Sequence, residues 1–238
     1  MRRFLKHIAC ICICIAIASS AAVGQTITSQ PATFEDYMPL LQDKGFDAYV
    51  FDISGLSDHK VQLAFTIREY EGDKLVKDNV LPWTHEYSNM LLLTDIPEEY
   101  RQSWIEDGMD DPERGILHLA KKITIGLMPA DADSLKRFSV SVENMGSFLN
   151  QLELKPLTVK ETGKVFYAYN TRPFKLDKAP AEGYVPLVLL GSIWWDEQVN
   201  VFRFCGENEI DPDLSVEKSM VHFIPHYYVF GVDIQPVD

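Results

Sequence analysis

His222 and His226 are the two residues whose spacing most resembles a metal-ligand pair. On an extended strand they share a face, but four residues of strand span roughly 13 Å. A metal ion holds each nitrogen ligand at about 2.1 Å, so a straight strand keeps the two side chains too far apart. Pro225 is placed to bend the strand and shorten this separation. We nevertheless interpret both histidines as packed or strand-edge residues and predict no metal site.

The sequence also lacks a complete catalytic motif. His85-Glu86 begins like a zinc-protease helix, but Asn89 stands where the second histidine must be. Gly146-Ser147 and Gly191-Ser192 do not have the flanking glycines of a nucleophile elbow, and no phosphate-binding or dinucleotide-binding glycine motif is present. These patterns predict no catalytic residue and no cofactor.

Cys205 is the remaining candidate for a nucleophile, which would need a base and a lowered thiol pKa. Arg203 lies two residues back, but Glu207 and Glu209 would oppose formation of the thiolate. We therefore interpret Cys205 as a buried, inert thiol.

Carboxylates gather in two short segments. Glu207, Glu209, Asp211 and Asp213 alternate, and such a loop binds calcium when it curls around the ion. The glycine and glutamate that a calcium-binding EF-hand loop requires are missing, so a solvated acidic loop is the preferred interpretation. The same interpretation applies to residues 106–113, where acids follow a predicted helix.

Aromatic and acidic residues suggest a glycan site less directly. The candidates for stacking on sugars are Trp83, Trp104, Trp194 and Trp195. Adjacent tryptophans on a strand point to opposite faces, so Trp194 and Trp195 cannot line one surface together. Asp196 and Glu197 resemble a glycosidase carboxylate pair, but neighbours at a turn do not flank a scissile bond. Core packing and a turn are the preferred interpretations.

Charge restricts the partners. The 238 residues include 22 Lys and Arg against 35 Asp and Glu, a formal net charge of −13. This acidic balance is unlike a nucleic-acid-binding footprint and disfavours docking to an anionic membrane. The hydrophobic share of 46% excludes a disordered chain and is ordinary for a globular one.

The N-terminus resembles a secretory signal. A basic segment over residues 1–7 precedes an apolar run over residues 8–18 and the small-x-small site at residues 22–24. The apolar run is too short to span a bilayer, which needs roughly 20 residues. Cys10, Cys12 and Cys14 lie within this run, in poor context for lipid attachment. We expect cleavage after Gly24, no membrane span thereafter, and a location in the periplasm or on the outer surface of a Gram-negative cell.

Removal of this leader deletes three cations and no acid, which makes the mature charge −16. Three of the four cysteines leave with it, and Cys205 alone cannot form an internal disulfide. The mature protein must therefore depend on its hydrophobic core for stability.

The elements that position these residues are mainly strands. Residues 61–67 alternate between apolar and polar, and Gly72-Asp73 predicts a hairpin to residues 74–80. Apolar residues occupy both faces of 185–195 and 221–234, which predicts interior strands covered on both sides. Further strands are predicted at 48–53, 90–93, 123–128, 138–143, 151–157, 165–169 and 199–205.

One helix is clear, with Asp95 as its cap, Pro97 in its first turn, and Gly108 at its end. A shorter helical turn starts at Thr33. Many strands with one or two short helices predict a mainly β fold, a two-sheet antiparallel β-sandwich. We expect it to form a single domain over residues 25–238.

Three segments carry a family resemblance. They are YNTRPFKL (169–176), VFRFCGENEIDPDLS (201–215) and IPHYYVFGVDI (224–234). Together with the length and the leader, they resemble a small family of exported Bacteroidetes proteins that form a domain of unknown function. The resemblance implies a Gram-negative envelope setting and provides no catalytic residues.

The sequence thus favours an exported, non-catalytic β-sandwich, a binding or envelope accessory module. Its expected partner is a protein or a neutral glycan, and not a nucleic acid. Two alternatives remain open, a glycan-directed hydrolase and a structural subunit of an envelope assembly. A cleft with two facing carboxylates would favour the hydrolase, and a large exposed apolar patch would favour the structural subunit.

Overall fold

The computed structural model describes residues 31–54, 60–82, 88–106, 109–159, 162–176, 180–204, 208–213 and 220–237. The chain divides into two units, residues 1–38 and residues 39–238. All described strands belong to the second unit. The predicted leader lies outside the described residues, as do Trp83, His85, Gly108, Cys205 and Glu207.

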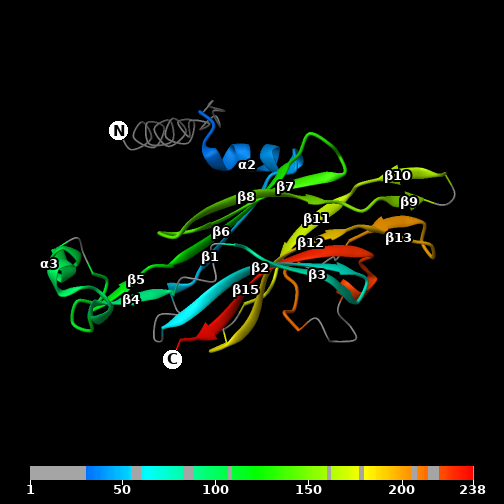
Figure 1. Cartoon of the computed structure of the whole chain (residues 1–238). Helices are drawn as coiled ribbons and strands as arrows, with labels where there is room; N and C mark the ends of the chain where they lie inside the picture. Colours follow the sequence, from blue (N-terminus) through cyan, green and yellow to red (C-terminus); the bar gives the residue numbers. More distant parts are fainter. Residues whose placement is uncertain are drawn as a thin grey trace, which may run out of the picture. The chain divides into compact units, whose positions relative to one another are not determined.

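The two larger sheets of the second unit are antiparallel (Figure 1). The four-stranded sheet has the order β1 (Asp47–Asp52), β6 (Lys122–Pro129), β7 (Leu135–Val142), β8 (Gly146–Glu153). The five-stranded sheet has the order β11 (Tyr169–Pro173), β12 (Gly183–Ser192), β15 (His226–Pro236), β2 (Val61–Glu71), β3 (Lys74–Val80). The predicted hairpin through Gly72-Asp73 is confirmed as β2 and β3.

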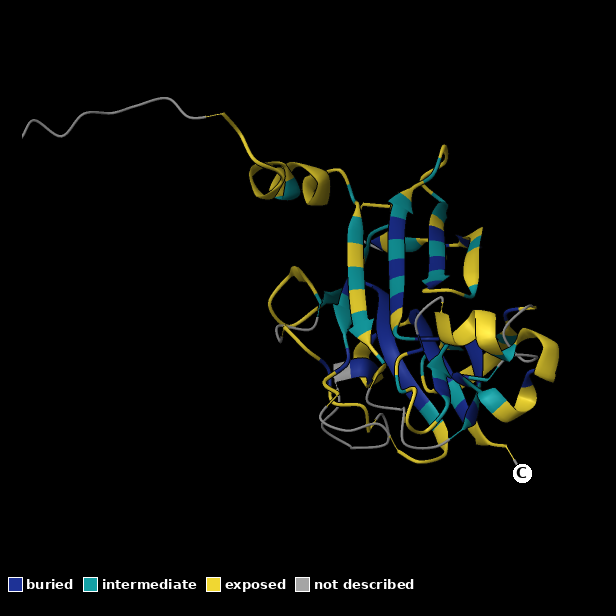
Figure 2. Ribbon diagram, turned by 90° about the vertical axis from the view of Figure 1, so that its left-hand side faces the viewer, coloured by how far each residue is buried: buried dark blue, intermediate teal, exposed yellow. Residues whose placement is uncertain are grey.

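The main core lies between these sheets. Its fully buried members include Leu63 on β2, Ile123 on β6 and Val188 on β12. Along β6 and β7, buried residues alternate with more exposed ones (Figure 2), because one face packs on the core and the other meets solvent. The mainly β, two-sheet sandwich is confirmed.

The five-stranded sheet is also covered on its outer face. A second cluster of buried side chains contains Leu189 of β12, Val229 of β15, and Ile210 and Ile224 from the C-terminal loops. These loops explain why β12 and β15 are apolar on both faces, as predicted. In β12 a bulge between Pro186 and Val188 interrupts the register with β15.

Short elements complete the described chain. Three further antiparallel sheets have two strands each among the described residues. They are β4 (Met90–Leu92) with β5 (Ile116–His118), β9 (Leu157–Val159) with β10 (Lys164–Phe166), and β13 (Trp194–Asp196) with β14 (Val201–Arg203). The described helices are α2 (Phe34–Asp43), α3 (Glu98–Glu106), and the 3-10 turns η2 (Leu93–Asp95) and η3 (Met220–Phe223). Among the described residues, no helix combines the length and apolar character needed to cross a membrane.

Several predicted boundaries were wrong. The predicted strand over residues 151–157 is divided between β8 and β9, and the one over 165–169 between β10 and β11. Residues 220–223 form η3, so the last strand begins only at His226. The two tryptophans leave β12 and belong to β13. A run of apolar residues marks burial, but it does not mark where strand pairing stops.

Two predictions about the helices, the cap of α3 and the length of the turn at Thr33, were wrong. Pro97 directly precedes α3, but Asp95 does not cap it. The Asp95 carboxylate accepts hydrogen bonds from the Leu92 backbone N–H at 3.2 Å and from Lys60 Nζ at 2.7 Å. The turn at Thr33 is a ten-residue helix, α2, whose Asp36 accepts hydrogen bonds from the Thr33 backbone and hydroxyl.

Candidate functional site

A cleft of about 380 Å³ lies where the edge strands β3 and β8 of the two sheets come together. Apolar side chains from the core, among them Ile67, Phe138 and Phe148, line part of it. The polar residues that line it are Glu69, Lys77, Asn79, Asn150, Gln151 and Glu153. The site therefore combines an apolar, partly aromatic lining with amide and charged groups.

Three of these polar residues lie on the core-facing side of an edge strand; Asn79 is half-buried there, and Lys77 and Asn150 are exposed. Asn150 pairs with the buried Phe138, and Asn79 pairs with the buried Ile67. Directly paired residues of antiparallel strands point to the same face of a sheet. Asn79 and Asn150 therefore face the space between the sheets. Lys77, two residues before Asn79 on β3, faces the same way.

The opposite side of the sandwich is closed by a direct hydrogen-bond chain. The Tyr49 hydroxyl on β1 donates to Thr171 Oγ1 on β11 at 2.7 Å. Thr171 Oγ1 in turn donates to the Asp47 carboxylate at 3.1 Å. One pair of edge strands is thus joined by side chains, whereas the pair formed by β3 and β8 borders a cleft.

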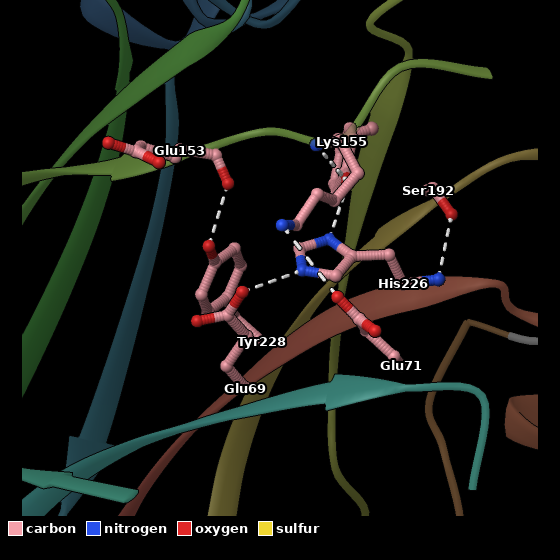
Figure 3. A network of polar contacts seen from close by, with 8 residues as sticks. Glu69, Glu71, Glu153, Lys155, Ser192, His226 and Tyr228 are labelled. Carbon is pink, nitrogen blue, oxygen red and sulfur yellow. Dashed lines mark hydrogen bonds and ion pairs between the residues drawn. The ribbon is translucent and has the colours of Figure 1, made fainter. Parts of the chain in front are cut away.

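A buried polar network lies next to the cleft (Figure 3). His226 on β15 is 3% exposed, and its Nε2 lies 3.0 Å from Glu69 Oε1 on β2. Its Nδ1 lies 2.6 Å from the Tyr169 hydroxyl on β11. The Lys155 backbone N–H donates to the same hydroxyl at 3.0 Å, and Tyr228 Oη donates to the Glu153 carbonyl at 2.7 Å.

Burial sets the protonation state of this network. Desolvation lowers the pKa of His226 below its usual value, and the hydrogen bond that His226 donates to Glu69 opposes that shift only in part. A neutral His226 fits the geometry, since Nε2–H donates to Glu69 while Nδ1 accepts from the Tyr169 hydroxyl. Burial also raises the pKa of Tyr169 and Tyr228, so both hydroxyls keep their protons at neutral pH.

Glu69 and Glu153 both line the cleft, but they do not form a facing pair. Glu153 follows the buried Leu152 on β8 and so belongs to the opposite face of its strand. Its carboxylate points away from that of Glu69 (Figure 3). The Glu69 carboxylate accepts a hydrogen bond from His226. The arrangement is suited to binding polar groups over an apolar surface.

The two histidines considered as a metal-ligand pair, His222 and His226, have different hydrogen-bond partners. His226 joins the buried network, whereas His222 in η3 lies 2.6 Å from Asp73 Oδ1 at the β2–β3 turn. Among the described residues, no group of three or more His, Cys, Asp or Glu side chains is placed to hold a metal ion. Asn89 is buried, and its Oδ1 accepts a hydrogen bond from the Val61 N–H.

The tryptophans and their acidic neighbours pack locally. Trp194 stacks on Phe223 with ring centroids 6.1 Å apart, and Trp195 meets the edge of Phe202 at 4.9 Å. Their different neighbours agree with opposite faces of β13. Asp196 ends that strand and pairs with Arg203 Nε at 2.8 Å, and Glu197 begins the turn. Trp104 is exposed on α3, which has no buried residue, so the expectation of core packing is wrong for it.

The acidic segments are loops in the described residues, except that Glu106 is the last residue of α3. Glu209, Asp211 and Asp213 are exposed, and the Asp213 N–H donates to Asp211 Oδ1 at 2.9 Å. Between them Ile210 is buried against the outer face of the five-stranded sheet. In the other segment, Asp110 accepts a hydrogen bond from the His118 N–H and forms an ion pair with Lys121.

Sequence reasoning did not identify the cleft or its residues. A signal was present, because asparagine interrupts the apolar alternation of Phe148 and Leu152 at position 150. A second asparagine, Asn79, falls on the core-facing side of the predicted hairpin. Single polar residues of this kind become meaningful only once the partner strands are known.

The fold and the site define an antiparallel β-sandwich with a polar cleft between two edge strands. A family model described as "Domain of unknown function (DUF5041)" matches residues 16–236. The chain therefore belongs to this family. No curated protein and no solved structure matches the chain.

Proposed function

We propose that this protein is an exported, non-catalytic binding module whose ligand occupies the cleft between β3 and β8. The observation that carries the proposal is the placement of Asn79, Asn150 and Lys77 on the core-facing side of two edge strands. Primary amides both donate and accept hydrogen bonds, so they suit an uncharged, polar ligand. The leader-like residues 1–24 support export.

The charge of the protein narrows the ligand class. The net charge of −13 disfavours polyanions. The charged residues that line the cleft are Lys77, Glu69 and Glu153, so the cleft has no excess of positive charge. A neutral glycan or an uncharged segment of a protein is the ligand that fits these groups.

A variant that fills the cleft tests this proposal. Arrays of neutral oligosaccharides and of synthetic peptides are probed with the wild-type protein, with Asn150→Arg and with Val50→Arg. Val50 is 62% exposed on β1, the opposite edge of the same sheet, and serves as the matched control. We expect binding to the wild type and to Val50→Arg, and a loss of at least about tenfold for Asn150→Arg.

A glycan-directed hydrolase is the alternative that one observation favours, since Glu69 and Glu153 both line the cleft. Their divergent directions and the His226 bond to Glu69 argue against it. Assays on polysaccharides, peptides and esters separate the two functions. Turnover that Glu69→Gln abolishes would contradict the binding module, as would array binding that Asn150→Arg leaves unchanged.

A further inference from the structure

β8 is an edge strand without the usual protection. Only β7 pairs with it among the described strands. Residues 146–152 contain no charged residue and no proline, and the pairing with β7 runs without a register shift. Natural edge strands usually carry charges, prolines or bulges that prevent another chain from pairing with them. An unprotected edge over residues 146–152 is a ready template for a further strand, whereas beyond it the Glu153 carbonyl is already bonded by the Tyr228 hydroxyl.

The other edge strand at the cleft, β3, has the features that normally prevent pairing with another chain. It carries Lys74, Lys77 and Asp78, and its pairing with β2 contains a bulge at Glu69 and Tyr70. Asp78 is also held by Arg68 Nε at 3.1 Å. Of the two strands that border the cleft, only β8 is therefore open to strand addition.

The hydrogen bonds between β7 and β8 show which backbone N–H and C=O groups of β8 point to its free edge. The Leu154 N–H donates to the Ser134 carbonyl at 2.8 Å, so even-numbered residues in this register bond to β7. In antiparallel strands, both backbone groups of a residue point to the same side. Ser147, Leu149 and Gln151 therefore turn their N–H and C=O groups to the free edge. Consistently, the Gln151 N–H donates to the Asn150 side chain at 2.8 Å and not to a strand.

We infer that the ligand of the cleft is an extended polypeptide segment of a partner protein, which pairs with the free edge of β8. This inference rests on the proposed binding function and names the class of its ligand. Main-chain hydrogen bonds provide affinity in such complexes, and alternate side chains enter adjoining pockets. Here those side chains enter the cleft beside Phe148 and Asn150.

The charges around β8 describe this segment further. Its central residues are uncharged, because β8 carries no charge before Glu153. The end of the segment that lies beside Glu153 carries Lys or Arg, which complements the carboxylate. A glycan would contact the cleft side chains, but it would leave the outward N–H and C=O groups of Ser147 and Leu149 without a strand partner.

The test uses peptides selected from a phage library of random decapeptides and then synthesised. Leu149→Pro removes one outward N–H of β8 without removing a bond to β7. Val50→Pro is the matched control on β1, the other edge of the same sheet. There the Ile53 N–H donates to the Lys121 carbonyl, so odd-numbered residues bond to β6. The N–H groups of even-numbered residues such as Val50 therefore point to the free edge. We expect Leu149→Pro to weaken peptide binding about tenfold and Val50→Pro to leave it within about twofold.

Amide exchange on the wild-type protein provides a second measurement that does not depend on how a variant folds. Bound peptide should slow hydrogen exchange at Ser147 and Leu149, whereas the amide of Phe148 is already protected by β7. Failure to select any peptide would overturn the inference, as would equal binding by Leu149→Pro and Val50→Pro with unchanged exchange along β8. If a neutral oligosaccharide binds in the cleft and Asn150→Arg abolishes that binding, the proposed function stands and the strand-addition inference is wrong.

Discussion

The Tyr169 hydroxyl connects the two sheets of the sandwich at the level of a single residue. It accepts a hydrogen bond from the Lys155 N–H, beyond the end of β8, and it bonds to His226 in the five-stranded sheet. Tyr169→Phe leaves His226 Nδ1 without its partner in a half-buried place, whereas the exposed Lys155 N–H can turn to water. We expect the free energy of unfolding to fall by about 1–3 kcal/mol, measured by urea denaturation.

Tyr100→Phe is the control for that change. Tyr100 lies on α3 and is 56% exposed, so loss of its hydroxyl should change stability by less than about 0.5 kcal/mol. A Tyr169→Phe protein as stable as this control would show that the network contributes nothing to joining the sheets.

His226 should make the stability of the protein depend on pH. Its pKa is lowered in the folded state, mainly by burial, so between that pKa and about 6.5 the unfolded chain binds more protons than the folded one. The contribution of neutral His226 is therefore complete above pH 6.5 and is lost as the pH falls. Glu69 on β2, Tyr169 on β11, Tyr228 on its own strand and the Lys155–Glu71 pair are the groups around it.

Urea denaturation at pH values from 7.5 to about 5 measures this dependence. We expect the wild-type protein to lose more stability over that interval than His226→Gln, whose amide does not titrate there. Parallel curves for the two proteins would contradict the assignment of a neutral, buried His226.

At the scale of elements, β12 and β15 depend on a glycine for their close packing. A Cβ at Gly231 on β15 would lie 2.4 Å from the Tyr184 ring, and that ring also holds Arg68, whose Cζ lies 3.5 Å from the ring centroid. Gly231→Ala must displace the ring. We expect a loss of about 1–3 kcal/mol, seen as a lower Tm in thermal unfolding.

A double-variant cycle separates this clash from other effects of the alanine. In the Tyr184→Leu background the ring is absent, so Gly231→Ala should cost less than it does in the wild type. Equal costs in both backgrounds would show that the contact with Tyr184 is not the cause.

At the scale of the whole molecule, the proposal of export makes a simple prediction. The protein recovered from the periplasm of an expressing Gram-negative host should begin at Gln25, because Ala22 and Gly24 satisfy the small-x-small rule. Intact mass and N-terminal sequencing measure this directly. A mature chain that starts at a lipidated Cys10, Cys12 or Cys14, or one that retains residues 1–24, would contradict it.

Local chemistry explains what could be predicted from the sequence. The hairpin of β2 and β3 was predictable because alternation and the Gly72-Asp73 turn involve neighbouring residues. The burial of β12 and β15 was predictable because apolar residues on both faces require cover on both sides. α3 was predictable from its proline and acidic first turn.

Only the tertiary structure decided where the candidate site lies. Sequence periodicity shows which face of a strand is buried, but it does not show which strands stand at an edge or which edges meet. Asn79 and Asn150 face one cleft because β3 and β8 end their sheets on the same side. His226 meets Tyr169 and Glu69 because β15 pairs with β2 and lies in the same sheet as β11. Such pairings join residues distant in the chain, and the free energy that selects them comes from the core formed by both sheets together.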